Sequence, residues 1–238
     1  IYLTSAEPNH RMICEEGTGS WCGWCVKGIV GLKKMSEKYG ERFIPIAAHT
    51  NADSETLFRA VRLGVSSFTH TFNCMPGIHH REPGVVGEAL LDDRLNCELI
   101  CDTIHVSVPA IKLVVKNKPH DKLTLITDAM RAKHMPDGES ELGGQLVIVK
   151  NGEARLIDGT LAGSVLRMNN AIRNVVTLCD VSFTDAIDFA TINPARTLGV
   201  DDRLGSIKKG KDASVTVMNE KDFTVALTVR SGEVIYKA

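Results

Sequence analysis

Four positions in the sequence place an imidazole or a carboxylate directly after a run of strand-forming residues. These positions are His49 after Phe43–Ala48, His70 after Ser66–Thr69, His105 after Leu99–Ile104 and Asp128 after Leu123–Thr127. The carboxyl ends of the strands in a parallel (β/α) barrel face one mouth, and catalysis takes place there. Imidazole nitrogens bind zinc, and a carboxylate beside them can take a proton from an activated water. The four positions therefore predict a divalent-metal site, without naming a substrate.

Strand-like and helical runs alternate from His49 onward, and they must position these side chains. Such alternation predicts an α/β layer or barrel built on parallel strands. The expected strands are Val65–Phe72, Cys97–His105 and Lys122–Thr127, and the expected helices are Ser54–Leu63, Pro109–Lys116, Asn169–Cys179 and Thr184–Ile192. Further strand-like runs with no helix between them predict a small β appendage: Gln145–Lys150, Ala154–Ile157, Ala213–Met218, Phe223–Arg230 and Glu233–Tyr236.

The composition narrows the class of protein. The net charge is −1, so no electrostatic field favours nucleic acid or an anionic membrane. No apolar run reaches the roughly 18 residues of a membrane helix, and the first residues lack the pattern of a signal peptide. The seven cysteines are odd in number and mostly scattered, which is typical of reduced thiols in a cytoplasmic protein.

Residues 12–48 have a different character from the rest of the chain. They predict a short strand, a Cys-x-x-Cys turn at Cys22 and Cys25, a helix from about Cys25 to Tyr39, and a second strand. A Cys-x-x-Cys pair at a helix N-terminus favours thiol–disulfide chemistry. The segment resembles the first βαβ unit of thioredoxin-like proteins, although the cis-proline strand of that fold does not follow. The pair could equally be a relic without a partner surface.

From His49 to the C-terminus, the chain resembles the N-acetylglucosamine-6-phosphate deacetylase family of the amidohydrolase superfamily. Eight stretches carry the resemblance, in the order and at the spacings of that family. They are "HTNA" (49–52), "THTFNCM" (69–75), "HREPGVVGEAL" (80–90), "DTIHV" (102–106), "LITDAM" (125–130), "DGTLAGS" (158–164), "NPARTLGV" (193–200) and "LGSIKKGKDA" (204–213). Together they are highly specific, whereas any one alone would be weak.

The resemblance implies a metal-dependent amidohydrolase that deacetylates N-acetylglucosamine 6-phosphate. It implies that His49 and His70 bind the metal, most readily zinc, although iron or another divalent metal is possible. Asp128 would activate the attacking water and then protonate the leaving amine, and His105 would polarise the acetamide carbonyl.

Other residues of the resemblance would bind the sugar phosphate. Asn73 and Cys74 match positions that contact the substrate, and the family usually has a small residue such as Ala at position 74. Arg81 matches the arginine that reaches the 6-phosphate of the neighbouring subunit in a homodimer. The segment Leu161, Ala162 and Gly163 matches a loop of the family that covers the sugar. A guanidinium suits phosphate because its donors form a planar fork.

The match begins at His49, so the family's N-terminal strands and metal-binding glutamate have no counterpart before it. Glu16, at the end of the first expected strand, is the candidate third ligand, and the alternative is a solvated acid. We therefore expect three parts: a thioredoxin-like βαβ segment (1–48), the C-terminal part of a TIM-type barrel (49–199) and a small β-sandwich portion (200–238). Two alternatives stay open, namely a thiol–disulfide protein acting through Cys22 and Cys25, and an inactive chimeric fragment.

Overall fold

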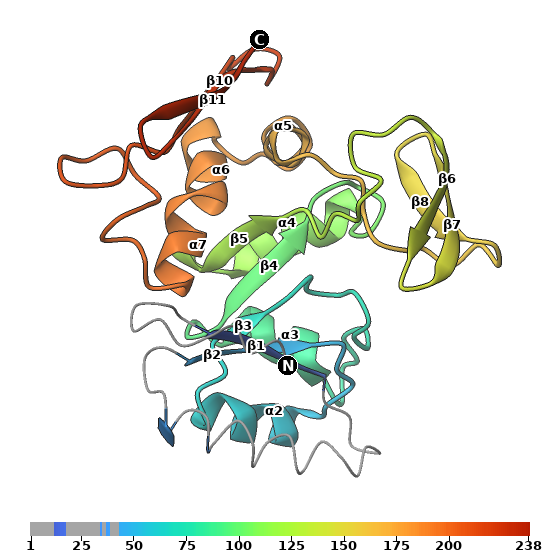
Figure 1. Ribbon diagram of the computed structural model, residues 1–238. Coiled ribbons are helices and arrows are strands. Elements are labelled where there is room, and N and C mark those ends of the chain that lie inside the picture. The colour runs from blue at the N-terminus through green and yellow to red at the C-terminus, as the bar shows by residue number, and fades with distance from the viewer. Residues whose placement is uncertain (1–11, 18–33, 35–36, 39–42) are drawn as a thin grey trace.

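The largest sheet is parallel and follows the order of the chain. The computed structural model describes residues 12–17, 34, 37–38 and 43–238 (Figure 1). Neighbours in the sheet are consecutive in sequence: β1 (Met12–Gly17), β2 (Phe43–Ala48), β3 (Ser67–Phe68), β4 (Asn96–Ile100) and β5 (Leu123–Ile126). Sheets of the doubly wound type reverse their strand order, whereas this one does not. The carboxyl ends of all five strands therefore lie along one edge.

Helices connect consecutive strands of this sheet. Three of them follow β2, β3 and β4: α2 (Ser54–Arg62), α3 (Gly84–Leu91) and α4 (Val108–Asn117). Three more follow the first small sheet: α5 (Met168–Leu178), α6 (Phe183–Ala190) and α7 (Ile192–Thr197). Side chains cap two of the helices, since Asp53 accepts from the Thr56 amide and Ser182 from the Asp185 amide.

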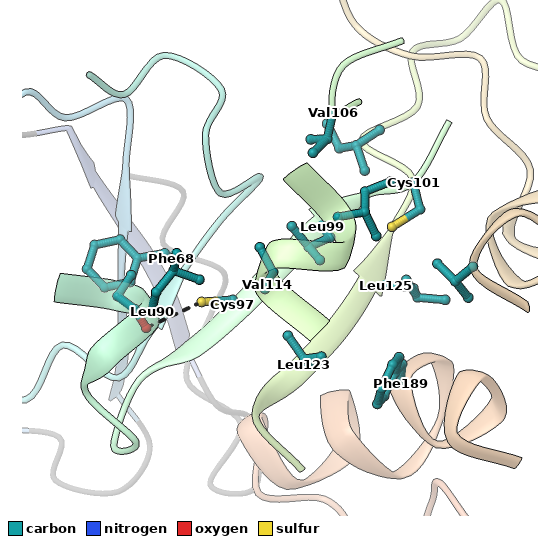
Figure 2. Close-up of a cluster of buried hydrophobic side chains, with 14 of the residues drawn as sticks. Phe68, Leu90, Cys97, Leu99, Cys101, Val106, Val114, Leu123, Leu125 and Phe189 are labelled. Atoms are coloured by element: carbon teal, nitrogen blue, oxygen red, sulfur yellow. Dashed lines mark hydrogen bonds between the residues drawn. The ribbon is translucent and has the colours of Figure 1, made fainter. Parts of the chain in front are cut away.

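The main core lies between the parallel sheet and its helices. Strand register places Cys97 and Leu99 of β4 beside Leu123 and Leu125 of β5, on one face. Figure 2 shows these side chains packed with Val114 of α4 and Phe189 of α6. The opposite face carries polar residues, because side chains alternate along a strand. There the Asn96 amide donates to Ser67 Oγ, and the Thr124 hydroxyl donates to Asn96 Oδ1.

Two small antiparallel sheets replace the single β appendage expected from the sequence. One consists of β6 (Gly138–Leu142), β7 (Gln145–Lys150) and β8 (Glu153–Leu156), and the other of β9 (Val215–Met218), β10 (Val225–Arg230) and β11 (Glu233–Lys237). Figure 1 shows them well apart, with β9–β11 at the end that carries the C-terminus. The hairpin of β7 and β8 pairs with β6, a strand that was not expected from the sequence. The β6–β8 sheet is therefore complete without a strand from the β9–β11 sheet.

Two of the expected strands are much shorter in the structure. Val65–Phe72 was expected as a strand, but β3 contains only Ser67 and Phe68. The chain turns there because His70 and Phe72 have positive φ values of 33° and 82°. The strand expected over Cys97–His105 ends at Ile100, since the Asp102 carboxylate accepts the backbone N–H groups of Ile104 and His105 and closes a loop.

Candidate metal-dependent hydrolase site

A pocket of about 500 Å³ lies at the carboxyl edge of the parallel sheet. Nine of the residues singled out in the sequence line it: His49, His70, Asn73, Cys74, His105, Asp128, Leu161, Ala162 and Gly163. They come from the ends of β2, β3, β4 and β5 and from the loop after β8. The expectation that successive strand ends gather their polar side chains in one place is therefore met.

The sequence did not single out the remaining lining residues, which are Ala129, Met130, Leu142, Gln145 and Leu156. Three of these belong to the β6–β8 sheet, whose hairpin reaches the pocket mouth. The hairpin carries apolar side chains in exposed positions, since Leu142 and Leu146 are each 41% exposed. The Gly143-Gly144 pair is the sequence signal that could have indicated this hairpin, whereas its place over the pocket depends on the tertiary structure.

Backbone conformation directs the side chains of three site residues into the pocket. His49, His70 and Asp128 each follow a strand and have positive φ values of 44°, 33° and 46°. This region of φ is uncommon for residues other than glycine, and such residues cluster at functional sites. In each case the chain leaves the sheet at this residue, and the side chain enters the pocket instead of continuing the alternation of the strand.

The His49 and His70 rings meet edge to face inside the pocket. Their Nε2 atoms are 3.0 Å apart, and the ring centroids are 4.7 Å apart at an interplanar angle of 76°. His70 is buried, whereas His49 is exposed at the pocket surface. The two Nε2 atoms therefore lie within hydrogen-bonding distance of each other, on the pocket side of both rings.

This geometry fits a metal ion. Two imidazole nitrogens bound to one tetrahedral zinc lie about 3.3 Å apart, given Zn–N bonds of about 2.05 Å. The described side chains form no group of three or more His, Cys, Asp or Glu that could hold a metal. Glu16 remains the candidate third ligand by the position of its backbone, because β1 pairs with β2 and Glu16 lies opposite Ala47. The Glu16 side chain lies outside the described part of the chain.

His105 is held by Asp102 on one side and by the loop over the pocket on the other. Its Nδ1 lies 2.5 Å from Asp102 Oδ2, and its Nε2 lies 3.0 Å from the Ala162 carbonyl oxygen. Both partners can only accept, so both ring nitrogens carry protons when both hydrogen bonds form. Burial disfavours the charged ring, but the hydrogen bonds to Asp102 and Ala162 and the charges of Asp102 and Asp128 outweigh it and raise the pKa of His105.

Asp102 shows the complementary effect. Burial opposes its charge, but hydrogen bonds from the His105 ring and from the backbone of His105 and Ile104 outweigh burial and lower the pKa of its carboxyl. Both shifts favour the carboxylate–imidazolium form of the pair, and the two side chains are only 8% and 9% exposed.

Arg81 does not line the pocket of its own chain. It is exposed, and its guanidinium lies 2.8 Å from Nε2 of His80. The turn that carries it is fixed to α2, because Glu82 Oε1 accepts from the amide and hydroxyl of Ser54 and from the amide of Gly84. These hydrogen bonds lower the pKa of Glu82. The turn thus leaves Arg81 exposed and outside the pocket that holds His49 and His70.

The thiol pair of the redox alternative, Cys22 and Cys25, lies outside the described residues. Among the described cysteines, Cys97, Cys101 and Cys179 are buried. Burial raises the pKa of all three, that of Cys97 to about 11, which removes the thiolate character that redox chemistry needs. Separately, none of the helices in the described ranges has the length and apolarity of a membrane span.

Parallel strands that carry histidine and aspartate at their carboxyl ends are typical of metal-dependent hydrolases. The comparison with known proteins narrows this class. The chain belongs to the Amidohydrolase family, whose profile matches residues 28–235. The match begins within the segment that resembles thioredoxin-like proteins and continues over both small sheets. The chain thus has an amidohydrolase-type α/β fold.

Individual relatives are deacetylases of amino-sugar phosphates. The chain is 44% identical to N-acetylglucosamine-6-phosphate deacetylase from Bacillus subtilis (strain 168), over 82% of this chain and 49% of that protein. It is 43% identical to N-acetylgalactosamine-6-phosphate deacetylase from Escherichia coli O157:H7, over 72% of this chain and 45% of that protein. The crystal structure of N-acetylglucosamine-6-phosphate deacetylase from Thermotoga maritima superposes with a TM-score of 0.84 and 32% identity, over 94% of this chain and 59% of that one. The chain therefore spans about half the length of the curated relatives it matches.

Proposed function

We propose that this chain carries the catalytic part of a metal-dependent deacetylase that hydrolyses N-acetylglucosamine 6-phosphate to glucosamine 6-phosphate and acetate. The observation that carries the proposal is the convergence of the His49–His70 pair, Asp128 and the Asp102-held His105 on one pocket. The similarity to N-acetylglucosamine-6-phosphate deacetylases supports this choice of substrate.

Each of these side chains has a separate role in the proposed hydrolysis. A divalent metal held by His49 and His70, most readily zinc, would supply an electrophile and an acidified water. Asp128 takes the proton from the water as it adds to the acetamide carbon, and then passes it to the amine nitrogen so that the C–N bond breaks. His105 donates its Nε2–H to the acetamide oxygen as negative charge develops there.

The loop of Leu161, Ala162 and Gly163 controls access to His105. The Ala162 carbonyl occupies the same Nε2–H that the acetamide oxygen needs. Bound substrate must therefore replace this carbonyl as the hydrogen-bond acceptor, while the loop covers the sugar. Asn73 would contact the sugar as well, although its amide also donates to the His70 carbonyl oxygen in the turn.

The finer architecture follows the same proposal. Strands β3–β5 belong to the C-terminal part of a TIM-type barrel, 49–199, and β1 and β2 of a thioredoxin-like βαβ segment, 1–48, extend the same parallel sheet. Residues 200–238 form a small β-sandwich portion. The uninterrupted strand order supports this interpretation. The active form is proposed to be a cytoplasmic homodimer in which Arg81 of one subunit binds the 6-phosphate in the site of the other, since Arg81 lies outside the pocket of its own chain.

The test is acetate release from N-acetylglucosamine 6-phosphate by the purified chain with zinc. Asp128→Asn should lower the rate by about 10²–10⁴-fold, which is the usual contribution of general acid–base catalysis. Asp201→Asn is the matched control, because it removes the same charge from an exposed residue outside the pocket. N-acetylgalactosamine 6-phosphate, the substrate class of the second relative, should be compared at the same time. A folded, metal-loaded chain that releases no acetate, or an Asp128→Asn variant as fast as wild type, would contradict the proposal.

A further inference from the structure

A second cavity, of about 430 Å³, lies apart from the catalytic pocket and shares no lining residue with it. It is enclosed by the first turn of α5, the C-terminal part of α6, and strands β9 and β10. Its volume lies within the roughly 300–1,000 Å³ that is common for small-molecule sites. Nothing in the proposed hydrolysis uses this cavity.

The charged residues of the cavity all have the same sign. Lys133 and His134 come from the loop after β5, and Arg167 directly precedes α5. The lining includes no aspartate or glutamate. Within the described part of the chain, Lys133, His134 and Arg167 are not among the residues with a side-chain hydrogen bond or an ion pair. The Lys133 and Arg167 cations therefore have no counter-charge within the cavity lining.

The basic residues are close enough to act on one another. Burial, followed by the charges of Arg167 and Lys133, lowers the pKa of His134. Repulsion of this kind is relieved when an anion binds, because the anion supplies the missing opposite charge. The N-terminal end of α5 adds positive potential on the same side, since Met168 and Asn169 of its first turn line the cavity.

The remaining walls are apolar or carry hydroxyl groups. Met168, Ile172 and Ile187 of α5 and α6 face Met218 and Val225 of β9 and β10 across the cavity. The cavity therefore offers an apolar floor beside its basic rim. Hydroxyl groups that can bond a polar ligand come from Thr191, Ser214, Thr216 and Thr228.

We propose that this cavity is a second binding site, distinct from the catalytic pocket, for a small organic phosphate with an apolar portion. A phosphate dianion balances several cations better than a carboxylate does, and the Arg167 guanidinium can bind two of its oxygens. The apolar portion of the ligand lies against Ile172 and Met218. A hydrated inorganic ion cannot use these apolar contacts, so it should bind less tightly than the organic phosphate. The proposal does not depend on the deacetylase activity.

The experiment is calorimetric titration with phenyl phosphate, inorganic phosphate and phenol. It is carried out in an Arg81→Gln background, so that the other proposed phosphate-binding residue does not contribute. Phenyl phosphate should bind best, because it uses both the rim and the floor. Arg167→Gln should weaken its binding about tenfold or more, as loss of a charged hydrogen-bond partner usually does. Lys133→Gln is a second variant should Arg167→Gln fail to fold.

Arg173→Gln is the matched control, because it removes an exposed arginine from the same helix outside the cavity. It should leave the affinity unchanged, and the unfolding temperature without ligand should be the same for all variants that fold. Equal binding by Arg167→Gln and its parent, or equal losses in Arg167→Gln and Arg173→Gln, would overturn the site. Phenyl phosphate binding no tighter than inorganic phosphate would overturn the apolar part of the proposal.

Discussion

Asp102 fixes His105 by its ring and by its backbone at the same time. One carboxylate oxygen lies 2.5 Å from His105 Nδ1, and the other accepts the amides of Ile104 and His105 at 2.8 Å each. The orientation and the protonation of the ring are therefore set by the same residue, and Nε2–H is left pointing at the pocket. Asp102 is a positioning residue in the proposed reaction, because it acts through His105.

Replacing Asp102 tests this relationship. In Asp102→Asn, the side-chain amide can donate to His105 Nδ1, which leaves the ring neutral and weakens Nε2–H as a donor. We expect kcat to fall by about 10–100-fold with little change in KM, as with other residues that orient a catalytic group. The pKa of His105, followed by NMR, should fall in the same variant. Asp158→Asn, which also removes a carboxylate that binds a backbone amide, is the control. An unchanged pKa with reduced kcat would leave Asp102 with a merely structural role.

The same pair predicts how stability depends on pH. The raised pKa of His105 gives stabilisation that is fully present below its ordinary value of 6.5 and is lost as pH rises through the raised value. The lowered pKa of Asp102 gives stabilisation that is present above 3.8 and is lost as pH falls through the lowered value. The difference in unfolding free energy between wild type and Asp102→Asn should therefore be largest between these two values, measured by urea denaturation. A difference that does not vary with pH would contradict an ionic pair.

The two pocket histidines predict where the metal binds. Removing either ligand in His49→Ala or His70→Ala should lower zinc affinity by at least about 10-fold, measured by competition with a chelating dye. Glu16→Gln should weaken binding similarly if Glu16 is the third ligand. His134→Ala is the control, because His134 lies outside the pocket. Full zinc affinity in both pocket variants would show that the metal binds elsewhere.

The proposed role of Arg81 predicts complementation between inactive variants. Arg81→Gln and Asp128→Asn should each be nearly inactive alone, whereas a mixed dimer has one site with both residues intact. Random mixing in equal amounts should recover about a quarter of the wild-type sites, since half of the dimers are mixed and each holds one intact site. Acetate release after mixing and re-equilibration measures this. No recovery from folded, exchanging dimers would place Arg81 in its own site or outside catalysis.

Alanine substitutions at two glycines after α7 should distinguish the effect of backbone strain from that of steric conflict. Gly205 has φ +80°, and a Cβ there would lie 2.8 Å from both Ala195 Cβ and Ile192 Cα. Gly210 has φ +93°, but no heavy atom lies within 4 Å of its Cβ position. Gly210→Ala should therefore cost about 1–2 kcal/mol of stability from backbone strain alone. Gly205→Ala should cost roughly 1–3 kcal/mol more, because α7 must move. Equal shifts in chemical denaturation would refute the packing argument.

Much of the candidate site could be predicted, because its residues follow strands. Parallel strands bring their carboxyl ends to one edge, so His49, His70, His105 and Asp128 needed only the strand pattern to be placed together. The strand boundaries were less accurate, as in Val65–Phe72, because apolar residues continue past the point where His70 turns the backbone. The β6–β8 sheet was missed as part of the site, since its hairpin reaches the pocket only through contacts far along the chain.

By itself, the sequence determined which side chains could do chemistry, since residue type and position after a strand are local properties. Only the tertiary structure decided how they meet. The 3.0 Å approach of the His49 and His70 nitrogens, the Ala162 carbonyl on His105 and the outward position of Arg81 depend on backbone φ values and on packing between distant segments. The basic cavity beside α5 is decided in the same way, because Lys133, Arg167 and the strands β9 and β10 come together only when the helices pack.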